Sequence, residues 1–350
     1  MEAIESEVVP GETVEQGAAI DADGAELSVP LFTEVTIDPA GDAIIVAKDG
    51  DGARTFIISS KAFSLVSEPW SAMVKYRTTM GPPATTQRME FTLEDDDVSA
   101  LELLLRIAHL QFRAVSPLID LRGLLELSVL TDKYQATEVV RPWLKGWLEE
   151  SWEKADDRAK IEHIWIAWEY GLLEELERLV AILVLEAETS KNSTILLHDG
   201  KILTDHLPPG LFDSILAARA SVMTKIVKII KPSLNRCTTA GNLIRFCKAH
   251  DPVCDAAICG SLIISLQDLH FYPRMVSDTL TTSVYKLASA SQGLILHTLK
   301  SEDGSHADCD FSAKVRDKVS AVLAESMPSA VTDAHRTHIL CQKNLLDLPE

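Results

Sequence analysis

The sequence predicts a small α+β domain near the N-terminus, followed by an all-α C-terminal region. Two runs rich in β-branched residues, Ala43–Ala47 and Thr55–Ile58, flank an Asp-Gly-Asp-Gly turn signal, as in a β-hairpin. A further strand-like run, Met89–Leu93, lies between segments that have helical periodicity. From about residue 155 onward almost every segment carries apolar residues at helical spacing.

Around these strands the pattern predicts helices that cap a small sheet. The alternating segment 33–37 precedes the hairpin, and Pro69 should divide the helical stretch 60–76 into two short helices. Asp and Glu residues at 94–97 favour the start of a helix, since negative charge stabilises a helix N-terminus. We therefore expect helices over 98–110, 122–134 and 139–152.

The C-terminal region is predicted to be helical and to be divided by prolines. We expect Pro232, Pro252 and Pro273 to mark breaks, and residues 192–203 to form a short hairpin. The expected helices cover 161–170, 172–188, 211–230, 240–250, 256–269, 276–287 and 311–326.

The chain is strongly acidic, with a net charge of −19. Eleven of its acidic residues precede Lys48, and no Lys or Arg does, so residues 1–30 are expected to be a disordered acidic tail. An acidic protein lacks the cations that neutralise phosphate, so neither direct nucleic-acid binding nor binding to an anionic membrane is expected. The longest apolar runs, such as Leu179–Leu185, are too short to span a bilayer.

The N-terminus has neither the basic segment nor the apolar segment of a secretory signal. We therefore expect an intracellular protein, in the nucleus, the cytoplasm or both. All six cysteines lie in the last third of the chain and are expected to be reduced.

Sequence motifs of the common enzyme classes are not found. There is no Gly-x-Ser-x-Gly, no phosphate-binding Gly-rich loop, no dinucleotide fingerprint and no His-Glu-x-x-His. Glu162 and His163 could form an acid–base pair, but Trp165 and Trp168 make an apolar helix face the better interpretation. The sequence therefore predicts a protein that is not an enzyme.

The cysteines leave two interpretations open. Cys237, Cys247, Cys254 and Cys259 lie ten, seven and five positions apart, whereas zinc fingers pair their ligands more closely. Buried free thiols are therefore preferred, and no cofactor is expected. If zinc were bound, the first candidate ligands would be Cys237, Cys254, His306 and Cys309.

Five segments, in this order, resemble the BTB/POZ domain, and most closely the divergent BTB proteins of filamentous fungi. Gly41–Val46 looks like the opening strand, and Phe56–Ser67 looks like the second strand with the first helix. Leu93–Val98 is similar to the acidic turn before the next helix. Leu127–Tyr134, which ends in Asp-Lys-Tyr, and Arg141–Trp143 resemble a later helix and its continuation. On this resemblance residues 31–152 form the BTB/POZ-like domain and residues 155–350 the helical region.

The resemblance implies a protein–protein interaction module that acts as a non-catalytic adaptor or dimerisation protein. The residues expected to contact a partner, by their positions in the family pattern, are Asp42, Ser67, Trp70, Met73 and Tyr134. The alternative for Trp70, Met73 and Tyr134 is a place in the core, because such side chains are usually buried.

Three functions remain open at this point. The module could dock on a cullin and present a substrate for ubiquitination, or it could bind a transcription factor as a nuclear co-regulator that does not contact DNA. In both cases a homo-oligomer is expected. The third is an enzyme with a substrate pocket in the helical region.

Overall fold

The fold is taken from a computed structural model of the chain. It describes residues 32–49, 52–80, 88–154, 160, 161, 163–190, 196–203, 207–238, 246–268, 272, 281–300, 304, 306, 308–325 and 329–346. The expected acidic tail at 1–30, and Glu162 of the proposed acid–base pair, lie outside these residues.

A four-stranded mixed sheet lies at the N-terminal end of the described chain. Its strands are β1 (Phe32–Thr36), β2 (Ala43–Asp49), β3 (Gly52–Ile58) and β4 (Met89–Leu93), in the order β1-β3-β2-β4. The predicted hairpin is confirmed, since β2 and β3 pair antiparallel, while β1 and β4 add at the two edges in parallel. Ile45 is opposite both Phe56 and Phe91, and all three are buried on one face of the sheet.

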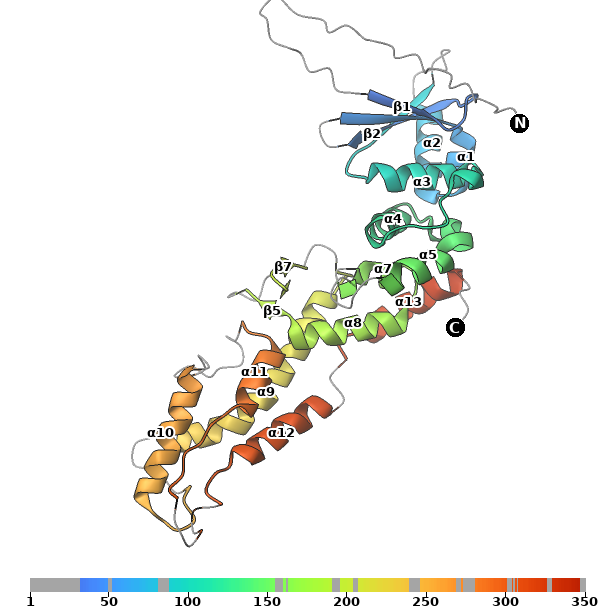
Figure 1. The fold of residues 1–350 in the computed structure, drawn as a ribbon. Coiled ribbons are helices and arrows are strands. Elements are labelled where there is room, and N and C mark those ends of the chain that lie inside the picture. The colour runs from blue at the N-terminus through green and yellow to red at the C-terminus, as the bar shows by residue number, and fades with distance from the viewer. Residues whose placement is uncertain are drawn as a thin grey trace, which may run out of the picture.

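Helices cover that face (Figure 1). As predicted, Pro69 lies at the start of a second short helix, where its missing N–H costs no hydrogen bond. Asp97 caps the third helix through a 2.8 Å bond from the N–H of Ala100. The helices are α1 (Ser60–Leu65), α2 (Glu68–Met80), α3 (Val98–Ala108), α4 (Leu121–Lys133) and α5 (Arg141–Lys154), with 3-10 turns η1 (Phe112–Ala114) and η2 (Thr137–Val140).

The rest of the described chain is mainly helical, as predicted. A small antiparallel sheet interrupts it, formed by β5 (Glu188–Thr189), β6 (Leu196–His198) and β7 (Lys201–Ile202), so the region is not entirely α. Strands β6 and β7 form the short hairpin predicted within residues 192–203. None of the described helices combines the length and apolar character needed to cross a membrane. These helices are α7 (Ile164–Glu169), α8 (Leu173–Glu186), α9 (Leu211–Thr238), α10 (Pro252–Asp268), α11 (Val284–Gln292), α12 (Ser312–Ala324) and α13 (Asp333–Leu346).

Some predicted boundaries were wrong. Pro232 lies within α9 instead of ending it. Pro232 is exposed, so its ring projects into solvent. Water can hydrogen-bond to the carbonyl group one turn earlier that has no N–H donor at the proline. Leu234, which follows the proline, is buried in a core. The helix expected over 240–250 is not present at 246–250, where His250 has a φ of 59°. Helix α13 was not predicted.

The buried side chains form a continuous core across the boundary expected near residue 155. One cluster contains Ile45 and Phe56 of the sheet together with Trp168 of α7, Leu183 of α8 and Ile339 of α13. A second cluster joins the later part of α9 to α10, α11 and α12. The two cores give an elongated molecule with the N-terminal sheet at one end and α10 at the other (Figure 1).

Helix α13 returns to the middle of the molecule and packs against α7 and α8 (Figure 1). Its backbone approaches Gly171, which follows α7 and has a φ of +73°. A Cβ atom at Gly171 would lie 2.5 Å from the amide nitrogen of Lys343. The contact therefore needs glycine for two reasons, the left-handed backbone and the close approach of another segment.

We expect Gly171→Ala to lower the free energy of unfolding by more than about 1 kcal/mol, because alanine fits neither the positive φ nor the space. Gly146→Ala is the matched control, since Gly146 lies within α5 with open space around its Cβ position. That control should be neutral or stabilising by about 0.5–1 kcal/mol. Urea unfolding of both variants measures the difference, and equal stabilities would contradict the packing described for α13.

Candidate functional site

Three of the predicted contact residues meet inside the N-terminal domain. Trp70 is fully buried and stacks on Phe63, with 4.2 Å between ring centroids, while its centroid lies 4.9 Å from that of Tyr134. The hydroxyl of Ser67 donates to the carbonyl oxygen of Tyr134 (2.6 Å) and accepts from the N–H of Trp70 (3.1 Å). This arrangement joins the start of α2 to the end of α4.

The acidic turn and the Asp-Lys-Tyr segment also contact one another. The carboxylate of Asp96 accepts from Lys133 Nζ at 2.5 Å and from the phenol of Tyr134 at 2.6 Å. Burial, and then the bond to Asp96, raise the pKa of the Tyr134 phenol well above its usual value, so the phenol stays protonated as a donor. Two of the segments that resemble the BTB/POZ domain, Leu93–Val98 and Leu127–Tyr134, thus contact each other through these bonds.

Asp42 and Met73 lie nearer the surface. The carboxylate of Asp42 accepts from the N–H and from the hydroxyl of Ser60, both at 2.7 Å. Burial raises the pKa of Asp42, but these bonds outweigh it and the pKa is lowered overall. Asp42 therefore ties the start of β2 to the start of α1, and Met73 is half-buried on α2.

The prediction of contact residues is corrected accordingly. Ser67, Trp70 and Tyr134 are buried, and a partner cannot touch them in this conformation. The core interpretation of Trp70 and Tyr134 is the one that the packing supports. The surface signal that the prediction missed lies further along α2, where Tyr76 and Met80 are each 71% exposed.

We expect Trp70→Ala to lower the free energy of unfolding by about 3–5 kcal/mol, because it leaves a cavity between Phe63 and Tyr134. Tyr76→Ala on the same helix should change it by less than about 0.5 kcal/mol, since the ring is exposed. Chemical denaturation of the two variants provides the measurement. A mild effect of Trp70→Ala would show that the ring is not part of the core.

A second candidate site is formed by Cys247, Cys254, His306 and Cys309. Each offers one ligand atom, all four atoms lie within 4.8 Å of one another, and all four residues are buried. Cys247 precedes α10 and Cys254 lies in its first turn, whereas His306 and Cys309 precede α12. The chain thus brings two pairs of ligand-type residues together from segments about fifty residues apart.

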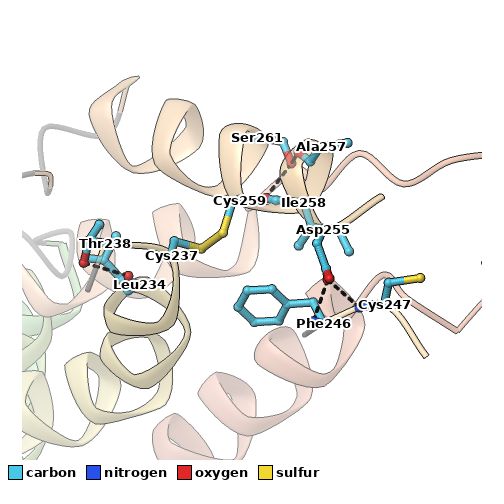
Figure 2. Close-up of a disulfide and its surroundings, with 10 residues drawn as sticks. All are labelled: Leu234, Cys237, Thr238, Phe246, Cys247, Asp255, Ala257, Ile258, Cys259 and Ser261. Carbon is cyan, nitrogen blue, oxygen red and sulfur yellow. Dashed lines mark hydrogen bonds between the residues drawn. A yellow bond between two sulfur atoms is a disulfide. The ribbon is translucent and has the colours of Figure 1, made fainter. Parts of the chain in front are cut away.

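Hydrogen bonds hold the two segments that carry Cys247, His306 and Cys309. One oxygen of Asp255 accepts from the N–H groups of Phe246 and Cys247, both at 2.7 Å, which holds that segment against α10 (Figure 2). The N–H of Cys309 donates to the carbonyl oxygen of His306 at 3.1 Å, forming a tight turn. The thiol of Cys247 lies 3.3 Å from Nδ1 of His306.

The zinc ligand set considered from the sequence needs one correction. Cys237 is bonded to Cys259 in a disulfide, so Cys247 takes its place beside Cys254, His306 and Cys309. The disulfide links the end of α9 to α10, and the sulfur of Cys247 points away from it (Figure 2). The prediction that all cysteines are reduced is therefore wrong for this pair, while Cys247, Cys254 and Cys309 are buried free thiols as expected.

The thiols of the cluster differ in acidity. Burial raises the pKa of Cys247, but hydrogen bonds from the backbone of Asp251 and Ala249 and from the neighbouring thiols bring it down to about 7. Burial and the neighbouring sulfurs raise the pKa of Cys254 to about 11. The cluster therefore favours one thiolate and resists a second unless a cation compensates the charge.

A pocket of about 280 Å³ opens beside this cluster. Its wall includes the cationic residues Arg236, Lys248, Lys314 and Lys318, and Asp308, which also lines it, pairs with Lys248 at 2.7 Å. Among the described residues that line it, cationic side chains outnumber acidic ones.

Another pocket, of about 310 Å³, lies next to the small second sheet. There Nε2 of His198 is 3.4 Å from a carboxylate oxygen of Glu186. Ser283, which also lines the pocket, is itself buried and accepts from the N–H of Lys286 as the cap of α11. Its hydroxyl thus caps the N-terminus of α11.

The most perturbed carboxyl group described lies at the junction of α7 and α13. Glu169 is fully buried, accepting from the hydroxyl of Thr137 at 2.6 Å and from Nε2 of Gln342 at 3.1 Å. Burial raises its pKa to about 8, against a usual 4.5. No solvent reaches the carboxyl group, so this network holds helices together and does not open onto a substrate site.

Glu169 makes stability depend on pH. Its pKa is higher in the folded than in the unfolded chain, so between about pH 5 and pH 8 the folded chain retains a proton that the unfolded chain loses. The free energy of unfolding should fall as pH rises through this range, by up to about 1.4 kcal/mol per pH unit.

Glu169→Gln should flatten that slope, whereas Glu174→Gln, an exposed change on α8, should keep it. Denaturation curves at several pH values compare the three chains. A slope unchanged by Glu169→Gln would contradict the raised pKa.

No protein-family model matches this chain, and no curated protein matches it either. The resemblance to BTB/POZ domains therefore stays a prediction from the residues that carry it.

Proposed function

We propose that this chain is a non-catalytic, intracellular protein-interaction protein whose residues 31–152 act as a BTB/POZ-type module. One observation carries the proposal. An apolar line on α2 emerges from the core of the small sheet domain and continues into solvent. Binding another polypeptide would remove these side chains from water.

The line consists of Met73, Tyr76 and Met80, which follow one another at spacings of three and four residues along α2. Such spacing places side chains on one face of a helix. Met73 is half-buried, and Tyr76 and Met80 are each 71% exposed. Leu65, at the end of the neighbouring α1, is 70% exposed as well. Aromatic residues and methionines are the types that protein interfaces favour.

A second feature that supports association is the free edge of the sheet. β1 is the outermost strand on one side, and it pairs only with β3 among the described strands. An edge strand presents backbone donors and acceptors that a strand of a second copy or of a partner can bond. The same domain therefore offers a helical face and a strand edge.

A non-catalytic role is supported by what the buried polar groups do. Asp96 holds Lys133 and Tyr134, and Glu169 holds Thr137 and Gln342, so these groups connect helices. The net charge of −19 favours protein partners over nucleic acid, because phosphates would be repelled. The role proposed is that of an adaptor or a dimerisation protein in the nucleus or cytoplasm.

Two negative charges introduced into the line of Met73, Tyr76 and Met80 on α2 test whether this line forms an interface. We expect the full chain to sediment as a homo-oligomer, and the double variant Tyr76→Glu, Met80→Glu to sediment as a monomer with an unchanged far-UV circular dichroism spectrum, because both side chains are exposed. Ile264→Glu, at a residue of α10 that is 58% exposed, is the control and should keep the assembly. Analytical ultracentrifugation over a range of concentrations gives the result.

Affinity capture with the same variants separates the two adaptor roles. Recovery of a cullin that is lost with the double variant supports the ubiquitin-ligase adaptor, whereas nuclear accumulation with a transcription factor supports the co-regulator. Met73→Ala is a suitable milder variant, whereas Trp70→Ala is not because it disturbs the core. A monomeric wild-type chain whose captured partners are indifferent to the double variant would refute the proposal, as would DNA binding at physiological salt.

A further inference from the structure

The Cys/His cluster at the far end of the molecule has the composition and the convergence of a metal centre. Three sulfurs and one imidazole nitrogen, all buried, lie within 4.8 Å of one another. With Zn–S bonds of about 2.3 Å and Zn–N bonds of about 2.0 Å, tetrahedral zinc holds its ligand atoms roughly 3.6–3.8 Å apart. The 3.3 Å between Cys247 Sγ and His306 Nδ1 is close to that spacing. The largest separation between two of the four ligand atoms would have to shorten by about 1 Å or less to reach that tetrahedral spacing.

We propose that Cys247, Cys254, His306 and Cys309 bind one structural Zn²⁺ ion. Four protein ligands fill a tetrahedral shell, so no position remains for water or a substrate, and the ion would have a structural role. A set of three thiolates with one imidazole suits zinc, because soft sulfur ligands select zinc, copper(I) or iron over calcium and magnesium. Nδ1 is the nitrogen of His306 that faces the cluster.

The spacing of the ligands is compatible with this site once both pairs are considered. Six residues separate Cys247 from Cys254, and two separate His306 from Cys309. The first interval contains a turn at His250 and the start of α10, where Asp251 accepts from the N–H of Val253 at 2.7 Å. The turn brings Cys247 back beside the first turn of the helix. The second pair is a tight turn of the short type found in zinc sites.

The surroundings explain what the ion would contribute. Among the residues that the structure describes, the hydrophobic cluster here has four buried members, Cys247, Cys254, Ile258 and Cys309, three of which are proposed ligands. So small a core provides little stabilisation by itself. An ion bound to both pairs would join the segment before α10 to the segment before α12. Binding would release the protons of those thiols that are still protonated.

The neighbouring disulfide indicates that the two kinds of cysteine have different roles. Cys237 and Cys259 are bonded to each other, whereas the three sulfurs of the cluster are free although they lie close together. Helix α10 would then be held on one side by a disulfide to α9 and at its start by the metal. This inference concerns the region after α9 and does not depend on the proposed partner-binding face of α2.

Metal analysis of the purified full chain tests the proposal. We expect about one zinc per chain by elemental mass spectrometry, and Cys254→Ser should lose most of it. Two control variants should keep it: Cys341→Ser, at an exposed free cysteine outside the cluster, and Cys259→Ser, at the disulfide. Iron or copper at one per chain in place of zinc, or zinc retained by Cys254→Ser, would overturn the assignment.

Spectroscopy keeps the proposal testable if the serine variant fails to fold. Cobalt(II) exchanged into the wild-type chain should give the strong absorption of tetrahedral cobalt together with thiolate charge-transfer bands. His306→Cys should retain the metal and intensify those bands, because a fourth thiolate replaces the imidazole. A chain that is purified with zinc in the buffer but remains metal-free, or that has a disulfide among Cys247, Cys254 and Cys309 by peptide mapping, would refute the site.

Discussion

The close approach of α13 to Gly171 is the contact on which the middle of the molecule depends. It lets a helix from the last part of the chain cover the Trp168 face of α7, where His338 stacks on the indole with 3.7 Å between ring centroids. Gln342 of the same helix donates to the buried carboxyl group of Glu169. Without α13, both the indole and the carboxyl group would face water.

Because α7 also packs against α4, this contact reaches the N-terminal domain. The buried side chains of the sheet and those of α7 and α8 belong to one cluster. The expected division near residue 155 therefore separates two parts that share a core. An isolated N-terminal fragment would expose apolar surface that α7 and α8 cover in the full chain, which is why the partner and assembly experiments use the whole protein.

The two ends of the molecule are stabilised in different ways. The N-terminal sheet has a dense core in which Phe63, Trp70, Phe91 and Tyr134 are in contact. At the far end a second core joins α9 to α12, and beside it lie the small cluster around Cys254 and the disulfide between α9 and α10. A covalent bond and a bound ion are the means by which small units compensate for a small core. Five of the six cysteines lie in this far part of the molecule, whereas Cys341 lies on α13.

Much of the fold could be predicted because local signals agreed with the packing. Two runs rich in β-branched residues and the turn signal between them predicted the hairpin of β2 and β3, and Pro69 located the break between α1 and α2. Helix α13 was missed because its buried positions include His335 and Gln342, which carry little apolar signal. The helix break predicted at Pro232 was wrong because an exposed proline near the end of a helix can be accommodated on the solvent side.

The candidate sites were predicted less completely, for a physical reason. Spacing along the chain cannot show which cysteines meet, since Cys237 and Cys247 both precede α10 and only the turn at His250 brings the second one to Cys254. In the same way, Trp70 and Tyr134 were predicted to contact a partner from their positions in the family pattern. Their burial, and the exposure of Tyr76 and Met80, depend on tertiary packing, which the sequence pattern does not show.

The position of α13 in the chain has a consequence for biosynthesis. A ribosome that has produced the sheet, α7 and α8 has made nearly all of the first core, but the face formed by Trp168 and Glu169 stays uncovered until residue 346 has emerged. N-terminal parts of a chain generally fold first during translation. The nascent protein would therefore expose this surface, including the indole of Trp168, for the time needed to translate α9 to α12. Chaperones that recognise exposed apolar surface could bind the chain during that interval.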